Sequence, residues 1–204
     1  MSFKDTYTDG VRQAVVPIAG RLVNRSHITP NSLTVAGLVL NVATVPFIVT
    51  GHFVLGAVVL LLAGCCDMFD GAVARLSAQV TPFGAFLDST SDRLSEGVVL
   101  LAIGVRFARH GGTWDLVGVF IALTMSFLVS YTRARAEALG LECKVGVASR
   151  PERIVLLAVG LFAARYHVLP VMIWVIAAAT SYTVAQRILH VRRQLTGDRP
   201  GATV

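Results

Sequence analysis

Apolar residues fill six long runs of the chain, and short polar segments separate these runs. A helix that crosses a bilayer needs about 20 mostly apolar residues to span about 30 Å of hydrocarbon. By this criterion the pattern predicts an all-α integral membrane protein with six transmembrane helices. Their approximate ranges are 31–50, 53–75, 82–109, 113–140, 151–167 and 169–191.

The segments outside these runs complete a single membrane domain over residues 1–204, because no internal repeat divides the chain. In residues 1–28, apolar side chains recur every three or four positions between Phe3 and Leu22, which predicts an amphipathic helix. Such a helix either lies in the membrane interface or packs against the rest of the protein. Residues 31–193 form the predicted six-helix bundle, and the polar residues 194–204 a flexible tail.

Composition supports a membrane location. Apolar residues make up 54% of the chain and charged residues only 15%, which is too apolar for an ordinary soluble domain. With a cytoplasmic N-terminus, all but four of the 18 Lys and Arg residues face the cytoplasm; Arg106, Arg109 and Arg165 face outside and Arg93 lies within a helix. We therefore predict a multi-pass protein of the cell membrane, with both termini and the active site facing the cytoplasm. The net charge of +6 needs no nucleic-acid partner.

Two neighbouring predicted helices carry acidic side chains, which are costly inside a bilayer and usually functional. Asp67 and Asp70 are three residues apart, and Asp88 and Asp92 are four apart, so each pair shares one helical face. The helices run in opposite directions through a short cytoplasmic turn. Asp70 and Asp88 lie roughly 8 and 9 Å from the helix ends at that turn, so all four carboxylates can meet at one depth.

Four carboxylates in one place repel one another unless a positive charge lies between them. All-oxygen ligation suits Mg²⁺, Mn²⁺ or Ca²⁺, and no His or Cys is spaced for a zinc site. Two ions about 4 Å apart are the arrangement that assists phosphoryl-type transfer. The same acids are also compatible with a buried ion-pair network that includes Arg93 and Arg75, and with a cation-transport site.

The acidic residues belong to a longer motif, Asp67-x2-Asp70-Gly71-x2-Ala74-Arg75-x8-Gly84-x3-Asp88-x3-Asp92. It resembles the complete signature of the CDP-alcohol phosphotransferases. The resemblance implies a homodimer of six-helix subunits with two Mg²⁺ or Mn²⁺ ions per active site. Asp67, Asp70, Asp88 and Asp92 would hold these ions, and Asp92 would also act as the catalytic base.

The same resemblance implies a pocket for the CDP group of a lipid donor such as CDP-diacylglycerol. Its expected members are Asn31, Thr34, Asp67, Gly71, Ala74, Arg75 and Gly84. The acceptor hydroxyl would attack the β-phosphate and release CMP.

Two further stretches bear on the acceptor. Residues 131–137, Tyr-Thr-Arg-Ala-Arg-Ala-Glu, and residues 150–153, Arg-Pro-Glu-Arg, resemble the branch that makes phosphatidylinositol phosphate or its archaeal ether-lipid counterpart. The resemblance implies that Arg133, Arg150, Arg153 and Arg187 bind the phosphate of a phosphorylated alcohol acceptor, inositol phosphate in that branch. Ser149 departs from this pattern, and arginines also gather at cytoplasmic helix ends without any ligand. Glycerol 3-phosphate is the alternative acceptor, and a divalent-cation transporter is the alternative of another class.

Overall fold

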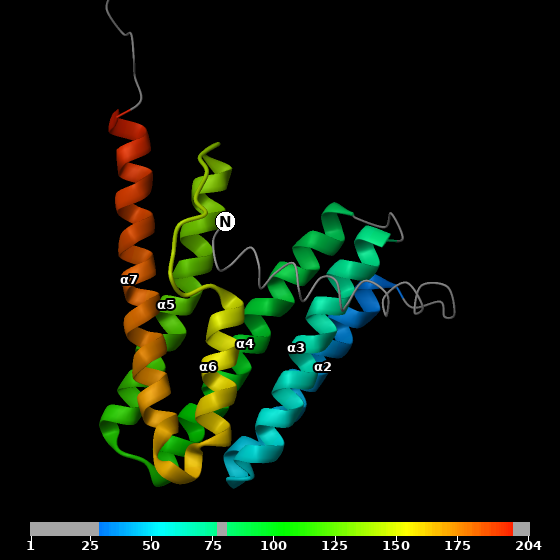
Figure 1. The fold of residues 1–204 in the computed structure, drawn as a ribbon, viewed down its shortest axis with the longest axis vertical. Coiled ribbons are helices and arrows are strands. Elements are labelled where there is room, and N and C mark those ends of the chain that lie inside the picture. The colour runs from blue at the N-terminus through cyan, green and yellow to red at the C-terminus, as the bar shows by residue number, and fades with distance from the viewer. Residues whose placement is uncertain (1–28, 77–80, 198–204) are drawn as a thin grey trace, which may run out of the picture.

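A computed structural model describes residues 29–76 and 81–197, and this part of the chain is a bundle of helices without strands (Figure 1). The predicted interfacial helix at 1–28 lies outside the described residues. The helices are α2 (Pro30–Thr50), α3 (Phe53–Leu76), α4 (Pro82–His110), α5 (Thr113–Ala138), α6 (Arg150–Phe162), the short 3₁₀ helix η1 (Ala164–Tyr166) and α7 (Val168–Gly197).

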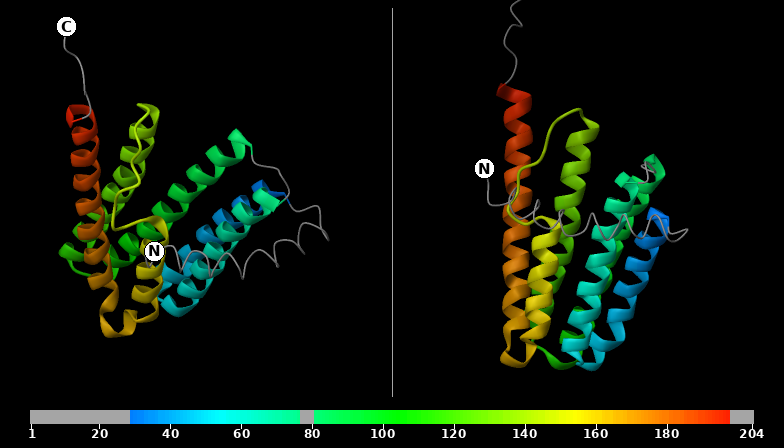
Figure 2. Two further views of the ribbon diagram at one scale, coloured as in Figure 1. Left: turned by 45° about the horizontal axis from the view of Figure 1, so that its top comes forward. Right: turned by 45° about the vertical axis from the view of Figure 1, so that its right-hand side comes forward.

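Successive helices run in opposite directions, as the short predicted turns require (Figure 2). The turn at Gly51-His52 joins α2 to α3, and Gly51 has a left-handed backbone with φ of 87°. Gly111-Gly112 joins α4 to α5. The starts of α2, α4 and α6 therefore lie at the same end of the bundle as the ends of α3, α5 and α7, which we call the site end.

Four of the helices, α2, α3, α5 and α7, are long and apolar enough to cross a membrane. Their outer faces carry exposed apolar side chains such as Val39, Val42, Leu62 and Val171, as expected for contact with lipid tails. The other two predicted spans differ from this pattern. Helix α4 carries Asp88, Asp92, Arg93 and Glu96 in its first half, and α6 has 13 residues, which span only about 20 Å.

The larger apolar core lies at the end opposite the site end, and a small apolar cluster around Ala72 and Val73 joins α2 and α3 at the site end. The larger core is built from the last turns of α2, α4 and α6 and the first turns of α3, α5 and α7. Its largest fully buried members include Ile48, Leu100, Ile103, Leu157 and Ile173. The helices are therefore fixed at one end by apolar packing, which leaves the polar halves of α3, α4 and α6 to build a site at the other.

The segment between α5 and α6, residues 139–149, lies against α7. The Thr183 hydroxyl accepts hydrogen bonds from the backbone amides of Val147 and Ala148, each 3.2 Å long. Further along α7, Gln194 Nε2 donates to the Glu142 carbonyl at 2.7 Å. This contact gives the last turns of α7 a partner, so the helix continues to Gly197, past the start of the predicted tail at 194; residues 198–204 are not described.

We expect Gly146→Ala to destabilise the protein more than Gly140→Ala. Both glycines have positive φ, 142° and 75°, so an alanine at either costs about 1–2 kcal/mol in backbone strain. At Gly146 a Cβ atom would also lie 2.6 Å from Thr183 Cγ2, whereas Gly140 faces open space. The thermal midpoint in detergent should fall by several degrees more for the Gly146 variant. Equal shifts would show that residues 139–149 adapt without cost.

Candidate active site

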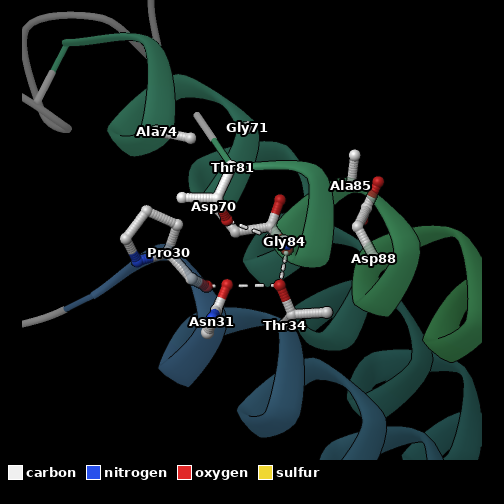
Figure 3. Close-up of a pocket in the computed structure, with 10 residues that line it drawn as sticks. All are labelled: Pro30, Asn31, Thr34, Asp70, Gly71, Ala74, Thr81, Gly84, Ala85 and Asp88. Atoms are coloured by element: carbon white, nitrogen blue, oxygen red, sulfur yellow. Dashed lines mark hydrogen bonds between the residues drawn. The ribbon is translucent and has the colours of Figure 1, made fainter. Parts of the chain in front are cut away.

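A pocket of about 250 Å³ opens at the site end between α2, α3 and α4 (Figure 3). It is lined by Pro30, Asn31, Thr34, Asp70, Gly71, Ala74, Thr81, Gly84, Ala85 and Asp88. Five of the residues expected to bind CDP are in this set: Asn31, Thr34, Gly71, Ala74 and Gly84. Asp67 does not line the pocket, and the structure does not describe the side chain of Arg75.

The pocket lies at the N-terminal ends of two helices that begin in the same way. Thr29 precedes Pro30 and accepts a hydrogen bond from the Ser32 amide; Thr81 precedes Pro82 and accepts one from the Gly84 amide at 3.0 Å. Threonine is a good N-cap, and proline suits the first helical position because its missing N–H is not needed there. The positive ends of both helix dipoles are therefore next to the pocket, which favours a bound phosphate.

Gly84 keeps the mouth of the pocket narrow but open. A Cβ atom at this position would lie 3.0 Å from Thr81 Oγ1 and 3.2 Å from Asn31 Oδ1. Any larger side chain would displace the polar groups that line the pocket.

Asp70 lines this pocket, and only 4% of its surface is exposed. Its Oδ2 atom accepts a 2.7 Å hydrogen bond from the Thr34 hydroxyl of α2. That bond fixes one carboxylate oxygen of Asp70, so Thr34 orients the acid as well as lining the pocket. Asp88 of α4 lines the same pocket from the opposite side (Figure 3).

The other two aspartates share a cation. Arg150, the first residue of α6, contacts Asp67 Oδ2 with Nη2 at 2.6 Å and Asp92 Oδ1 with Nη1 at 2.7 Å. The guanidinium therefore joins α3, α4 and α6 at the site end. The sequence predicted Arg150 at the acceptor phosphate, with Arg75 and Arg93 as possible partners of the acids. In the structure Arg93 donates to the Ser89 carbonyl, and its charge also acts on Asp88.

The four carboxylates are gathered at one end of the bundle. The charge of Asp92 interacts with those of Asp88, Asp67 and Asp70, and Arg150 supplies an opposing charge. Within residues 29–76 and 81–197, however, no three His, Cys, Asp or Glu side chains are arranged around a single metal position. The donor set still fits a hard cation, because its ligands are carboxylate oxygens and two of them already hold one positive group between them.

The four arginines expected at the acceptor phosphate come from α5, α6 and α7. Arg187 of α7 is close enough to Arg133 and Arg153 for their charges to repel. Arg187 donates to the carbonyls of Val145 and Val129, and Arg133 pairs with Glu137 at the surface. Arg153 pairs with Glu96 in the interior. The structure thus brings Arg187 close to Arg133 and Arg153, whereas Arg150 lies with the aspartates. Each of the four already has a partner in the protein.

Sequence reasoning missed five residues of this region, one of which is Ala85 in the lining of the pocket. Pro30 and Thr81 line the pocket, and the Thr-Pro pairs that begin α2 and α4 were the available signal. Gly37 was also missed: a Cβ atom there would lie 2.6 Å from Asp67 Oδ1, so its lack of a side chain lets Asp67 pack against α2. Nothing in the sequence assigned a role to Glu96, although an acid beside the motif in an apolar helix was visible.

Comparison with known proteins identifies the motif. The profile of the CDP-alcohol phosphatidyltransferase family matches residues 27–185. The chain belongs to this family. This match confirms the resemblance drawn from the eight motif positions. The protein is therefore an enzyme that transfers a substituted phosphate group.

Its curated relatives point to one branch. It is 38% identical over 189 residues to the archaetidylinositol phosphate synthase of Methanothermobacter thermautotrophicus, covering 91% of this chain and 92% of the relative. It is 36% identical to the phosphatidylinositol phosphate synthase of Corynebacterium glutamicum, covering 87% and 84%.

Solved structures of the phosphatidylinositol phosphate synthase of Mycobacterium tuberculosis share the fold. The structure with CDP-DAG bound has a TM-score of 0.82 and 33% identity, covering 94% of this chain and 98% of that one. The complex with manganese and citrate has a TM-score of 0.81 and 33% identity, covering 93% and 92%.

We expect Gly37→Ala to weaken divalent-cation binding roughly 10–100-fold, because the new methyl group forces the Asp67 carboxylate away from its position. Mn²⁺ affinity measured by calorimetry, with the thermal midpoint as a check on folding, tests this. Gly64→Ala on α3 is the matched control, because its Cβ would meet only Ile154 Cγ2 at 3.9 Å. Equal Mn²⁺ affinity in the two variants would show that Asp67 does not take part in metal binding.

Proposed function

We propose that this protein transfers a phosphatidyl group, or an ether-lipid equivalent, from a CDP-linked lipid to the hydroxyl of inositol phosphate and releases CMP. The observation that carries the proposal is the pocket at the starts of α2 and α4, with Asp70 and Asp88 in its lining and Asp67 and Asp92 next to it. The names of the relatives support inositol phosphate over glycerol 3-phosphate, and family membership supports an enzyme over a transporter.

The donor is proposed to bind with its CDP group in the pocket. The positive ends of α2 and α4 attract its phosphates, and Gly71 and Gly84 let it approach the backbone. Asp67, Asp70, Asp88 and Asp92 are the residues that would hold two Mg²⁺ or Mn²⁺ ions. Bound there, the ions supply charge stabilisation to the pyrophosphate oxygens.

Asp92 is proposed as the general base. Its carboxylate takes the proton of the acceptor hydroxyl, the acceptor oxygen forms a bond to the β-phosphorus, and the bond from that phosphorus to the CMP oxygen breaks. Arg150 contacts both Asp67 and Asp92, so an acceptor phosphate beside Arg150 would place its alcohol next to the base. Arg133, Arg153 and Arg187 extend the positive charge around that phosphate.

The membrane arrangement is part of the proposal. We infer that α4 and α6 join the four apolar helices in a six-span bundle, with residues 1–28 as an interfacial helix. The site end and both termini would face the cytoplasm, and the protein would act as a homodimer. The exposed apolar side chains of α2 and α3 support insertion in a membrane, and the excess of Lys and Arg in the segments at the site end supports the orientation.

The purified protein in detergent should release CMP from CDP-diacylglycerol, or from its diether analogue, only when Mn²⁺ or Mg²⁺ and an acceptor are present. We expect inositol phosphate to give the highest kcat/KM among inositol phosphate, glycerol 3-phosphate, inositol and serine. Converging arginines favour the two phosphorylated acceptors, and the names of the relatives favour inositol phosphate over glycerol 3-phosphate. EDTA should abolish the release. A preference for glycerol 3-phosphate would assign the alternative acceptor, and no CMP release with any acceptor would contradict the proposal.

Asp92→Asn should lower kcat by about 10²–10⁴-fold, the usual contribution of a general base, while CDP affinity changes little. Asparagine keeps the shape of the side chain and removes only its charge, so the position next to Arg150 Nη1 stays filled. CMP release at saturating substrate and calorimetric CDP binding separate the two effects. Turnover within tenfold of the unsubstituted protein would remove Asp92 as the base.

A further inference from the structure

A buried ion pair lies one helical turn deeper than the aspartate site. Arg153 Nε and Nη2 each donate a 2.6 Å hydrogen bond to one carboxylate oxygen of Glu96. The side chains are 3% and 7% exposed. Taking two charges out of water is expensive, and an apolar pair of the same size often gives equal or better stability. Stability alone is therefore a weak reason for this pair.

The spacing of the charged residues indicates a positioning role. Glu96 is four residues after Asp92 on α4, and Arg153 is three residues after Arg150 on α6. The pairs Asp92–Arg150 and Glu96–Arg153 are therefore stacked one turn apart, both joining the same two helices. Because α6 packs mainly on α3 and α7, these side chains link it to α4 at the site end.

Arg153 also holds the backbone that leads into α6. Its Nη1 atom donates a 2.9 Å hydrogen bond to the carbonyl of Ala148, whose amide is bonded to Thr183 of α7. One guanidinium thus fixes the start of α6 against α4 and against the preceding segment. Arg150 is the first residue of that helix, so the direction of its side chain depends on this anchor.

We propose that Glu96, acting through Arg153, is a positioning residue that sets the first turn of α6 and so holds the Arg150 guanidinium between Asp67 and Asp92. Glu96 does not touch substrate in this proposal. It determines where the cation of Arg150 lies relative to the base and to the acceptor phosphate. The kinetic effects expected from this proposal rest on the proposed function. The expected change in chemical labelling of Arg150, described below, does not.

The first variant is Glu96→Gln, which keeps the size of the side chain and leaves Arg153 in place. If Glu96 positions Arg150, kcat/KM for the acceptor should fall at least tenfold while the KM for the CDP-lipid stays within twofold. If Arg153 simply bound the acceptor, freeing it from Glu96 would leave acceptor kcat/KM unchanged or raise it, which would overturn the proposal. Glu142→Gln, which removes the exposed partner of Lys144, is the matched control and should behave like the unsubstituted protein.

A lone buried arginine can prevent folding, so a second variant replaces both charges: Glu96→Leu with Arg153→Met. This pair should keep the thermal midpoint near that of the unsubstituted protein and show the same loss of acceptor kcat/KM. Full activity in a folded double variant would also overturn the proposal.

A measurement without turnover completes the test. Modification of arginines by phenylglyoxal, followed by mass spectrometry, reports how well Arg150 is held by its two carboxylates. In both variants the labelling rate of Arg150 should rise several-fold, whereas that of Arg187, which is bonded to backbone carbonyls, should not. An unchanged Arg150 rate contradicts the proposal even if the protein proves to use another substrate. An inactive unsubstituted protein contradicts only the proposed function.

Discussion

The structure depends on balancing negative charge where water is scarce. Asp67, Asp70, Asp88 and Asp92 repel one another at the polar end of the bundle, and nearby hydrogen-bond donors and cations offset part of this repulsion. The chain supplies partners of two kinds: the Thr34 hydroxyl for Asp70, and the Arg150 guanidinium for Asp67 and Asp92. A third helix, α6, thereby becomes part of a site that the motif places on α3 and α4 alone. The larger apolar core is at the opposite end, so these polar contacts contribute to the spacing of the helices at the site, together with the small apolar cluster between α2 and α3.

Features with a local cause could be predicted from the sequence. Helical periodicity put each aspartate pair on one face, and the short turns made the helices antiparallel; both follow from spacing along the chain. The start of α2 and the extent of α3 were predicted within a residue or two for the same reason. The helical fold and the family motif belong to this class, since each depends on residues close together in the chain.

Features that depend on distant residues were harder to predict. Arg150 and Asp67 are 83 positions apart, and only the fold shows that the arginine lies between two acids of the motif. Glu96 and Arg153 are also far apart in the chain, and only the fold shows that they form an ion pair. The length of α6 was overestimated because the apolar run continues beyond Phe162, whereas the backbone there turns through η1 and the left-handed residue His167. Hydrophobicity alone does not report such a break.

The surroundings of the pocket have a consequence for how a lipid could be handled. Phe83 and Phe86, next to Gly84 and Ala85 on α4, are 62% and 63% exposed, and Val35 on α2 is 47% exposed. The pocket, which contains Asp70 and Asp88, is thus bordered by exposed apolar side chains. An amphiphile could swing its head group sideways into the pocket while its acyl chains remain among neighbouring lipids. The enzyme would then not have to extract its lipid substrate from the membrane. The lipid product would leave by lateral diffusion into the bilayer.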